Sequence, residues 1–313
     1  MNISGAIDRG FSTLNRNWQL LLIHLVGRIT NCILFVVLVI LPLVIMLVSS
    51  GINPEDMLLI HQSPGLFISE HRGLLFISFF LVFLYILVAS TVSIYILGGK
   101  AGILSRSCVT SENFSLQNFF SEAKRMFLPT VRFLTVTGLI GIGLMFLTVL
   151  FSLGLYAILV MLGDVSKTLQ VFVAIIAGIP LILGLLSGII WFSGAFLVGL
   201  GDVAISGTTS LTAFRNGSSM MMNSVSIFLL FTGLLVGYIL VAVIVSTGGL
   251  AIRLIPLVGL IIALPYQIVA ALIQGYAGMF LLSTGISLIY EYAKLAHEKT
   301  QKQTDLLNSN PEA

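Results

Sequence analysis

The polar side chains best placed for chemistry lie in the last long apolar segment of the chain, residues 266–290. Gln267 and Gln274 are seven residues apart, so a helix places both amides on one face. Two interpretations are open: the amides form hydrogen bonds between helices, or they line a polar cavity approached by a broken segment around Pro256 and Pro265. The predicted cavity-lining residues are Tyr266, Gln267, Gln274 and Tyr276, in a segment that also holds Ser283, Thr284 and Ser287.

Motifs of known catalytic sites are missing from the sequence. It contains no HExxH, GxSxG or Walker sequence, and these patterns are the usual signatures of metalloproteases, serine hydrolases and nucleotide-binding loops. Cys32 and Cys108 have no CxxC partner, which argues against a metal or redox site. His24 is interpreted as a polar residue at the membrane boundary. We therefore expect no catalytic residue and no cofactor.

A metal site has one candidate. His61 and His71 are ten residues apart in a polar connection, where histidines are more often solvated than bound to metal. The prediction is therefore that the chain binds no metal. The acidic residues that could complete such a site are Glu55, Asp56 and Glu70.

Composition places the chain among membrane proteins. Of its 313 residues, 58% are hydrophobic and only 9% are charged, against about 25% charged in an average soluble domain. Long apolar runs recur, and about 20 consecutive apolar residues are enough to cross a bilayer. The formal net charge of +3 comes without any basic run, so nucleic acid is not an expected partner.

A repeated stretch organises the chain. Residues 115–139 and 210–234 align without gaps, with Ser115 matching Ser210 and Phe119 matching Phe214. Each copy is an amphipathic polar segment that leads into a long apolar one. Residues 4–18 show the same pattern, with Phe11 and Trp18 on the apolar side. The repeats indicate a helix at the membrane surface followed by spanning helices.

The expected fold is all-α: a polytopic membrane protein of six transmembrane helices, arranged as three parallel repeats of an interfacial amphipathic helix plus two spans. Spans are expected near residues 29–48, 74–97, 131–162, 170–200, 224–246 and 266–290, with a bend at Pro129. Residues 252–264 are expected to form a short outer half-helix or a re-entrant segment. The single transmembrane domain is 1–290, with repeats at about 1–99, 100–201 and 202–290, and 291–313 is a polar cytoplasmic tail.

Basic residues predict the orientation, because Lys and Arg are enriched on the cytoplasmic side of membrane proteins. With both termini inside, the outer side holds only Arg72, Lys167 and Arg253. The expected location is the cytoplasmic (inner) membrane of a prokaryote. The inner side holds Arg9, Arg16, Arg28, Lys100, Arg106, Lys124, Arg125, Arg132, Arg215, Lys294, Lys299 and Lys302.

Small residues predict where helices approach closely. Two glycine pairs have the four-residue spacing that opens a flat groove on a helix in a membrane. In apolar segments so rich in glycine, such spacing also arises by chance. The candidates for helix packing are Gly184, Gly188, Gly233 and Gly237.

The chain resembles a family of six-span prokaryotic membrane proteins of unknown function, related to the membrane domain of some glycerophosphoryl diester phosphodiesterases. The resemblance lies in RGFSTLNRNWQLLL near the N-terminus, the connection from Gly98-Gly99 to Phe120, GDVAISGTTSLTAF, and IPLVGLIIALPY before a final span that ends in Tyr290. The catalytic domain of those phosphodiesterases has no counterpart here. The resemblance therefore implies a fold but transfers no activity and no site residue.

Three classes of function remain open. The first is a non-enzymatic integral membrane protein that organises lipid or a membrane partner. The second is a transporter or export-permease component for a lipid-like or neutral substrate, which would need an ATPase partner because no energy-coupling residue is visible. The third, an intramembrane lipid-processing enzyme, is the least favoured. The expected partners are membrane lipid, a second copy of the chain, or an unidentified membrane or ATPase partner.

Overall fold

A computed structural model describes residues 3–49, 51, 72–255 and 258–309 of the chain, and its elements within these ranges are all helical. The long apolar helices run well past bilayer thickness at their polar ends. In chain order the helices are α1 (Ile3–Arg16), α2 (Leu20–Phe35), the π-helical turn η1 (Val36–Ile40), α3 (Leu41–Ser49), α6 (Arg72–Thr110), α7 (Leu116–Val165), α8 (Lys167–Ser206), α9 (Ser210–Asn223), α10 (Val225–Arg253) and α11 (Val258–Ser309).

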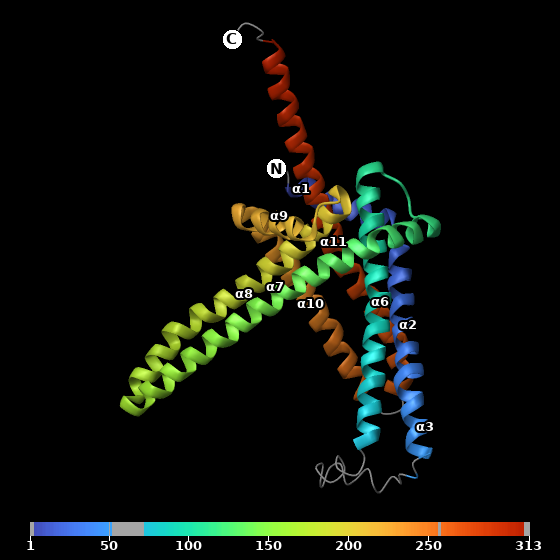
Figure 1. Ribbon diagram of the computed structural model, residues 1–313, viewed down its shortest axis with the longest axis vertical. Coiled ribbons are helices and arrows are strands. Elements are labelled where there is room, and N and C mark those ends of the chain that lie inside the picture. The colour runs from blue at the N-terminus through green and yellow to red at the C-terminus, as the bar shows by residue number, and fades with distance from the viewer. Residues whose placement is uncertain (1–2, 50, 52–71, 256–257, 310–313) are drawn as a thin grey trace.

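Six of the described helical stretches are long and apolar enough to cross a membrane, and α2, η1 and α3 together make the first of them. They pair into three arms: α2–α3 packs on α6, α7 on α8, and α10 on α11. Figure 1 shows the α7–α8 arm diverging from the other helices. The expected fold class, all-α with six membrane-spanning candidates, agrees with these helices.

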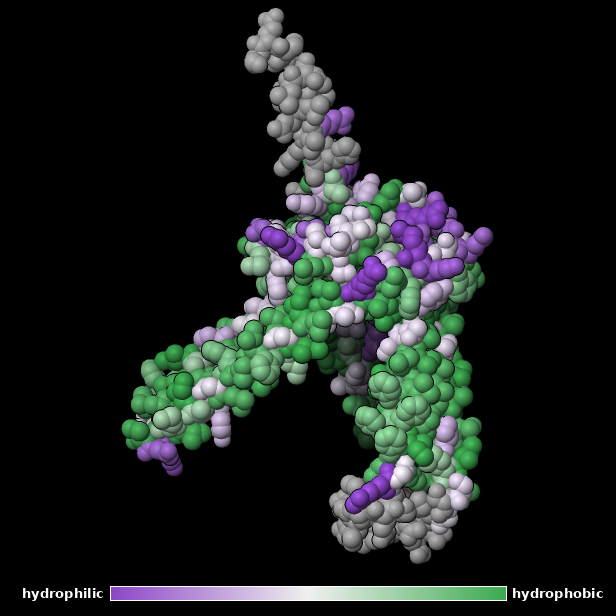
Figure 2. All heavy atoms as spheres, in the orientation of Figure 1, coloured by the Kyte–Doolittle hydropathy of each residue, from purple (hydrophilic) through white to green (hydrophobic). Residues whose placement is uncertain are grey.

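The arms meet at one end in a layer that we call the hub. It comprises α1, α9, residues 116–130 of α7, and residues 98–110 of α6, 194–206 of α8 and 279–291 of α11. The large side chains of the core are here or directly beneath it, among them Leu14, Phe119 and Phe133, each almost fully buried. The arms instead expose apolar side chains along their length, and polar residues gather over the hub (Figure 2). This division is typical of a protein whose arms are solvated by lipid.

Small residues bring the hub helices into close contact. The end of α6 packs on the start of α7 at Gly99, where an added Cβ would lie 2.5 Å from the Phe119 ring. The end of α8 packs on α9 at Gly217, and the middle of α11 packs on α1 at Gly10, where a Cβ would lie 3.0 Å from Thr284 Cα. Each amphipathic helix therefore lies against the end of one arm.

Local sequence explains several helix ends. The Ser115 hydroxyl accepts a hydrogen bond from the Asn118 amide at 3.1 Å, so Ser115 caps α7 as its sequence predicts. Gly207 ends α8 with a φ of 64°, a left-handed conformation that glycine adopts without strain. In the first arm, Pro42 has no amide hydrogen, and the preceding turn widens to a π-helix in which the Leu41 amide bonds to the Val36 carbonyl.

Two expected helix boundaries are wrong. α6 continues past Gly98 and Gly99 to Thr110. α7 is continuous through Pro129, where a bend is expected. α11 begins at Val258 and passes through Pro265, so residues 258–264 are the start of the last long helix rather than a separate half-helix. A proline in a long helix costs one backbone hydrogen bond, and packing with neighbouring helices compensates that loss. A proline in the sequence is therefore not sufficient to predict that a helix ends there.

The four glycines predicted to mediate helix packing do not do so within this chain. An added Cβ at Gly184, Gly188, Gly233 or Gly237 would meet no described atom within 4 Å. Close helix approach occurs instead at the hub glycines. Packing of these four positions against another molecule stays a prediction.

Gly217 provides a test of hub packing. A Cβ at this position would lie 2.5 Å from the Ala195 carbonyl oxygen, a backbone atom that cannot move aside. We expect Gly217→Ala to lower the free energy of unfolding by about 1–3 kcal/mol, the usual cost of overpacking, measured by thermal unfolding in detergent. Gly237→Ala is the matched control and should be neutral or stabilise by up to about 1 kcal/mol, because alanine favours helices. Equal stabilities for the two variants would contradict this packing.

Candidate functional site: a basic cavity between the arms

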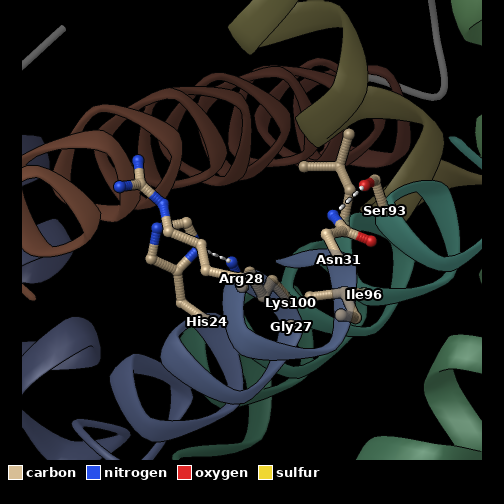
Figure 3. Close-up of a pocket in the computed structure, with 8 residues that line it drawn as sticks. His24, Gly27, Arg28, Asn31, Ser93, Ile96 and Lys100 are labelled. Carbon is tan, nitrogen blue, oxygen red and sulfur yellow. Dashed lines mark hydrogen bonds between the residues drawn. The ribbon is translucent and has the colours of Figure 1, made fainter. Parts of the chain in front are cut away.

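Three basic side chains line the same space at the lower edge of the hub. His24 and Arg28 are one helical turn apart on α2, so they share a face. Lys100 projects from α6 toward them, and its Nζ lies 2.9 Å from His24 Nδ1 (Figure 3). Since an ammonium group has only donors, the imidazole nitrogen accepts this hydrogen bond.

Two glycines make room for this cluster. An added Cβ at Gly27 would lie 2.5 Å from Ile96 Cδ1, so the missing side chain lets α2 and α6 approach closely. An added Cβ at Gly275 would collide with the His24 ring, so the ring occupies space that only glycine leaves free on α11. Close packing of α2 against both α6 and α11 therefore fixes the position of His24.

The basic cluster lines two adjoining hollows, which we call together the apical cavity. The first has a volume of about 340 Å³ and lies between α2 and α6. The second, of about 190 Å³, lies where α2 and α6 face α8, α10 and α11. Both hollows are lined by His24, Arg28, Leu97 and Lys100. Helices of all three arms thus contribute to the cavity.

Other polar groups complete its wall. The Asn31 amide donates to the Ser93 hydroxyl at 3.2 Å (Figure 3), and Asn31 Oδ1 has no hydrogen-bond partner within the described part of the chain. Tyr238 and Gln274 line the second hollow. Neutral polar groups therefore flank the basic groups on several sides.

The charge of the cavity is not balanced by acidic residues. Lys100 is only 7% exposed, and among the described residues no carboxylate lines either hollow. A buried basic group without an acidic partner is costly, because desolvation is not offset by an opposite charge. An anion in the cavity would remove that cost.

The carboxylates of the hub are committed elsewhere. Glu122 pairs with Arg125 at 2.6 Å and lies 3.8 Å from Arg106. The Glu291 carboxylate pairs with the Arg9 guanidinium at 2.9 Å, and the same guanidinium lies over the Tyr290 ring. These side chains hold hub helices together. None of these pairs includes His24, Arg28 or Lys100, the basic residues of the cavity.

The residues predicted to line a cavity are only partly brought together. Gln274 lines the apical cavity. Gln267 is exposed and does not line the described hollows. Tyr266 donates its hydroxyl to the Val245 carbonyl of α10, and Tyr276 donates to Asn15 Oδ1 of α1 at 2.8 Å. The two tyrosines therefore form hydrogen bonds between helices, and for the two glutamine amides that interpretation stays a prediction.

The described residues offer no group of side chains that could bind a metal ion. Within the described residues, no group of three His, Cys, Asp or Glu side chains is close enough to hold a metal ion. Cys32 and Cys108 are free thiols in different surroundings, one exposed and one buried. His61 and His71 lie outside the described residues.

The basic cluster itself was missed by the sequence analysis. It assigned Arg28 and Lys100 to the inner membrane surface and His24 to the boundary, each as a separate residue. A signal was present: His24 and Arg28 have helical spacing within an apolar run, and Lys100 stands alone in the apolar segment after Gly98-Gly99. Polar residues so placed mark functional sites in membrane proteins.

Comparisons with known proteins add no relative. The sequence matches no protein-family model, and neither a curated protein nor a solved structure is significantly similar to it. The resemblance to the phosphodiesterase-associated membrane family stays a prediction.

Lys100→Met tests the unbalanced charge. In delipidated protein we expect this variant to raise the free energy of unfolding by about 1–3 kcal/mol, because it replaces a buried, uncompensated cation with an apolar side chain of similar length. Inorganic phosphate should raise the unfolding temperature of the unmodified protein but not of the variant.

Lys124→Met is the control for this measurement, since Lys124 is exposed on the hub. It should change the free energy of unfolding by no more than about 0.5 kcal/mol. If Lys100→Met destabilised the delipidated protein, the cation would instead have a stabilising partner.

Proposed function

We propose that this chain is a non-enzymatic integral membrane protein that holds the anionic, phosphate-bearing group of a lipid in its apical cavity. The observation that carries the proposal is the buried Lys100, which joins His24 and Arg28 with no carboxylate among the described lining residues. A buried charge needs a partner of opposite charge, and Lys100 has no such partner among the described lining residues.

The chemistry of the donors favours phosphate. A guanidinium group binds two oxygens of a phosphate at once, and an ammonium group binds as a point charge. Arg28 and Lys100 supply one of each, with the Asn31 and Gln274 amides as neutral groups beside them. The cavity offers binding groups, and its wall presents no paired nucleophile and base in the described chain.

The position of the cavity fits a lipid head group. It lies directly below the hub, at the depth where apolar arms give way to polar helices (Figure 2). We propose that the hub lies at the cytoplasmic surface of a prokaryotic inner membrane, with both termini inside. The basic residues of the hub support this orientation, since Lys and Arg are enriched on that side.

The proposed three repeats have support in the contacts. In each, an amphipathic helix precedes a helical hairpin: α1 before α2–α6, residues 116–130 before the rest of α7 and α8, and α9 before α10–α11. Each amphipathic helix packs on the end of the hairpin before it, and α1 packs on the middle of α11. Three equivalent units closing on one another would produce this arrangement.

Transport of a lipid is the second candidate. The observation in its favour is the divergence of the α7–α8 arm, which separates it from the other arms below the hub (Figures 1 and 2). Movement of lipid would require a partner that supplies energy, such as an ATPase. Transfer of a fluorescent lipid across proteoliposomes, with and without co-expressed partners, distinguishes transport from retention.

Bound lipid provides the main test. Native mass spectrometry of protein extracted gently from its own membrane should detect a phosphate-bearing lipid. In the double variant Arg28→Gln/Lys100→Gln, the fraction of protein that carries this lipid should fall at least about tenfold. The reason is that each lost charge-assisted hydrogen bond contributes about 1.5–3 kcal/mol. The control Lys124→Gln/Arg132→Gln removes the same formal charge from exposed positions. Equal lipid occupancy in both double variants would refute the proposal.

Labelling from the two sides tests the orientation. In a background with Cys32→Ser and Cys108→Ser, Lys167→Cys lies at the first residue of α8, beside the turn from α7, and Lys124→Cys lies in the hub. An impermeant thiol reagent should label position 167 in intact cells and position 124 only after permeabilisation. The reverse result would place the hub outside.

A further inference from the structure

We propose that the lipid held by this protein lies with its acyl chain in a groove along α6, so that the ligand is a phospholipid-like amphiphile rather than a free phosphate. This inference rests on the proposed function, since it assigns the tail of the molecule whose head group occupies the apical cavity. It names the place, the ligand class and the route of entry.

The groove continues from the apical cavity. A shallow hollow of about 480 Å³ lies on α6, with one residue of α7 at its edge. Ser93 lines both this hollow and the cavity above it, so the two lie next to each other along α6. The groove is lined by Tyr85, Ile86, Ala89, Ser90, Ser93, Ile94 and Leu134.

One face of α6 forms the floor of both spaces. Ile86, Ser90, Ser93, Leu97 and Lys100 follow one another at steps of four, three, four and three residues. This spacing keeps all five on a single helical stripe. Along that stripe the side chains change from basic and buried at Lys100 to apolar and open to the side at Ile86. An amphiphile has the same order of polarity.

The length of the groove suits an acyl chain. Tyr85 precedes Ser93 by eight residues, which is about 12 Å at 1.5 Å per residue. One leaflet contributes about half of a hydrocarbon core that is about 30 Å thick. Tyr85 also contacts Phe35 of α2, with ring centroids 5.2 Å apart, and this pair closes the groove on the α2 side. Most of a chain of one leaflet could lie against α6.

Two observations select lipid as the occupant. The groove lies within a helix that is a candidate membrane span, where lipid is the surrounding solvent, and its upper end opens to a basic cavity that complements a phosphate. The side of the groove away from α2 faces α7 at Leu134. A lipid of the hub-side leaflet can therefore enter between α6 and α7 without leaving the membrane.

Ala89→Phe tests the tail site separately from the head-group site. The variant fills the groove but lies about three helical turns from Lys100. We expect it to weaken binding of dioleoylphosphatidic acid about tenfold or more, because displacing a few buried methylene groups is sufficient. Binding of glycerol 3-phosphate should stay within about twofold of the unmodified protein. Both affinities can be measured by microscale thermophoresis in detergent.

Matched controls keep the test decisive. Ala157→Phe makes the same change at an exposed position of α7 outside the groove and should alter neither affinity. If Ala89→Phe does not fold, Ile86→Ser substitutes for it, since Ile86 is exposed and its loss leaves the core intact. Ile86→Ser should weaken the lipid and spare glycerol 3-phosphate.

The binding measurements distinguish failure of the proposed function from failure of the tail site. If Lys100→Gln leaves both ligands unchanged, the head-group site and the proposed function are wrong. If Lys100→Gln weakens both ligands but groove variants weaken neither, or weaken both equally, only the tail site is overturned. The tail site is also overturned if the unmodified protein binds glycerol 3-phosphate as tightly as the lipid.

Discussion

Close packing at the hub is the constraint on which the rest of this structure depends. Gly10, Gly99 and Gly217 allow each amphipathic helix to lie directly against the end of an arm. In a membrane, helices gain little from burying apolar surface, so contacts of this kind supply much of the attraction between them. The arms below the hub are free to diverge because their exposed apolar side chains are already suited to lipid.

The apical cavity follows from that arrangement. Helices that are tightly joined at one end and diverge below it leave a space under the junction, and here the space is lined by Lys100, His24 and Arg28. Glu122 and Glu291 of the hub are already paired with arginines outside the cavity. The cavity therefore keeps a positive charge that a bound anion can balance, and the α6 groove extends it toward the apolar arms.

Much of the helical framework could be predicted because it depends on local sequence. Apolar runs longer than a bilayer needs gave the six long helices, and amphipathic spacing gave α1 and α9. The error was at Pro265, where the helix continues. Proline weakens a helix locally, but neighbouring helices and the apolar surroundings decide whether it ends there.

By itself the sequence determined the helical class and the presence of six helices long and apolar enough to cross a membrane. It also singled out Gln274, which lines the cavity. Only the tertiary structure brought His24 and Lys100, 76 residues apart, to 2.9 Å, and only it showed Gly184 and Gly237 facing open space. Hydrophobicity and capping act between neighbours in the chain, whereas the partner of a buried charge depends on how distant helices pack.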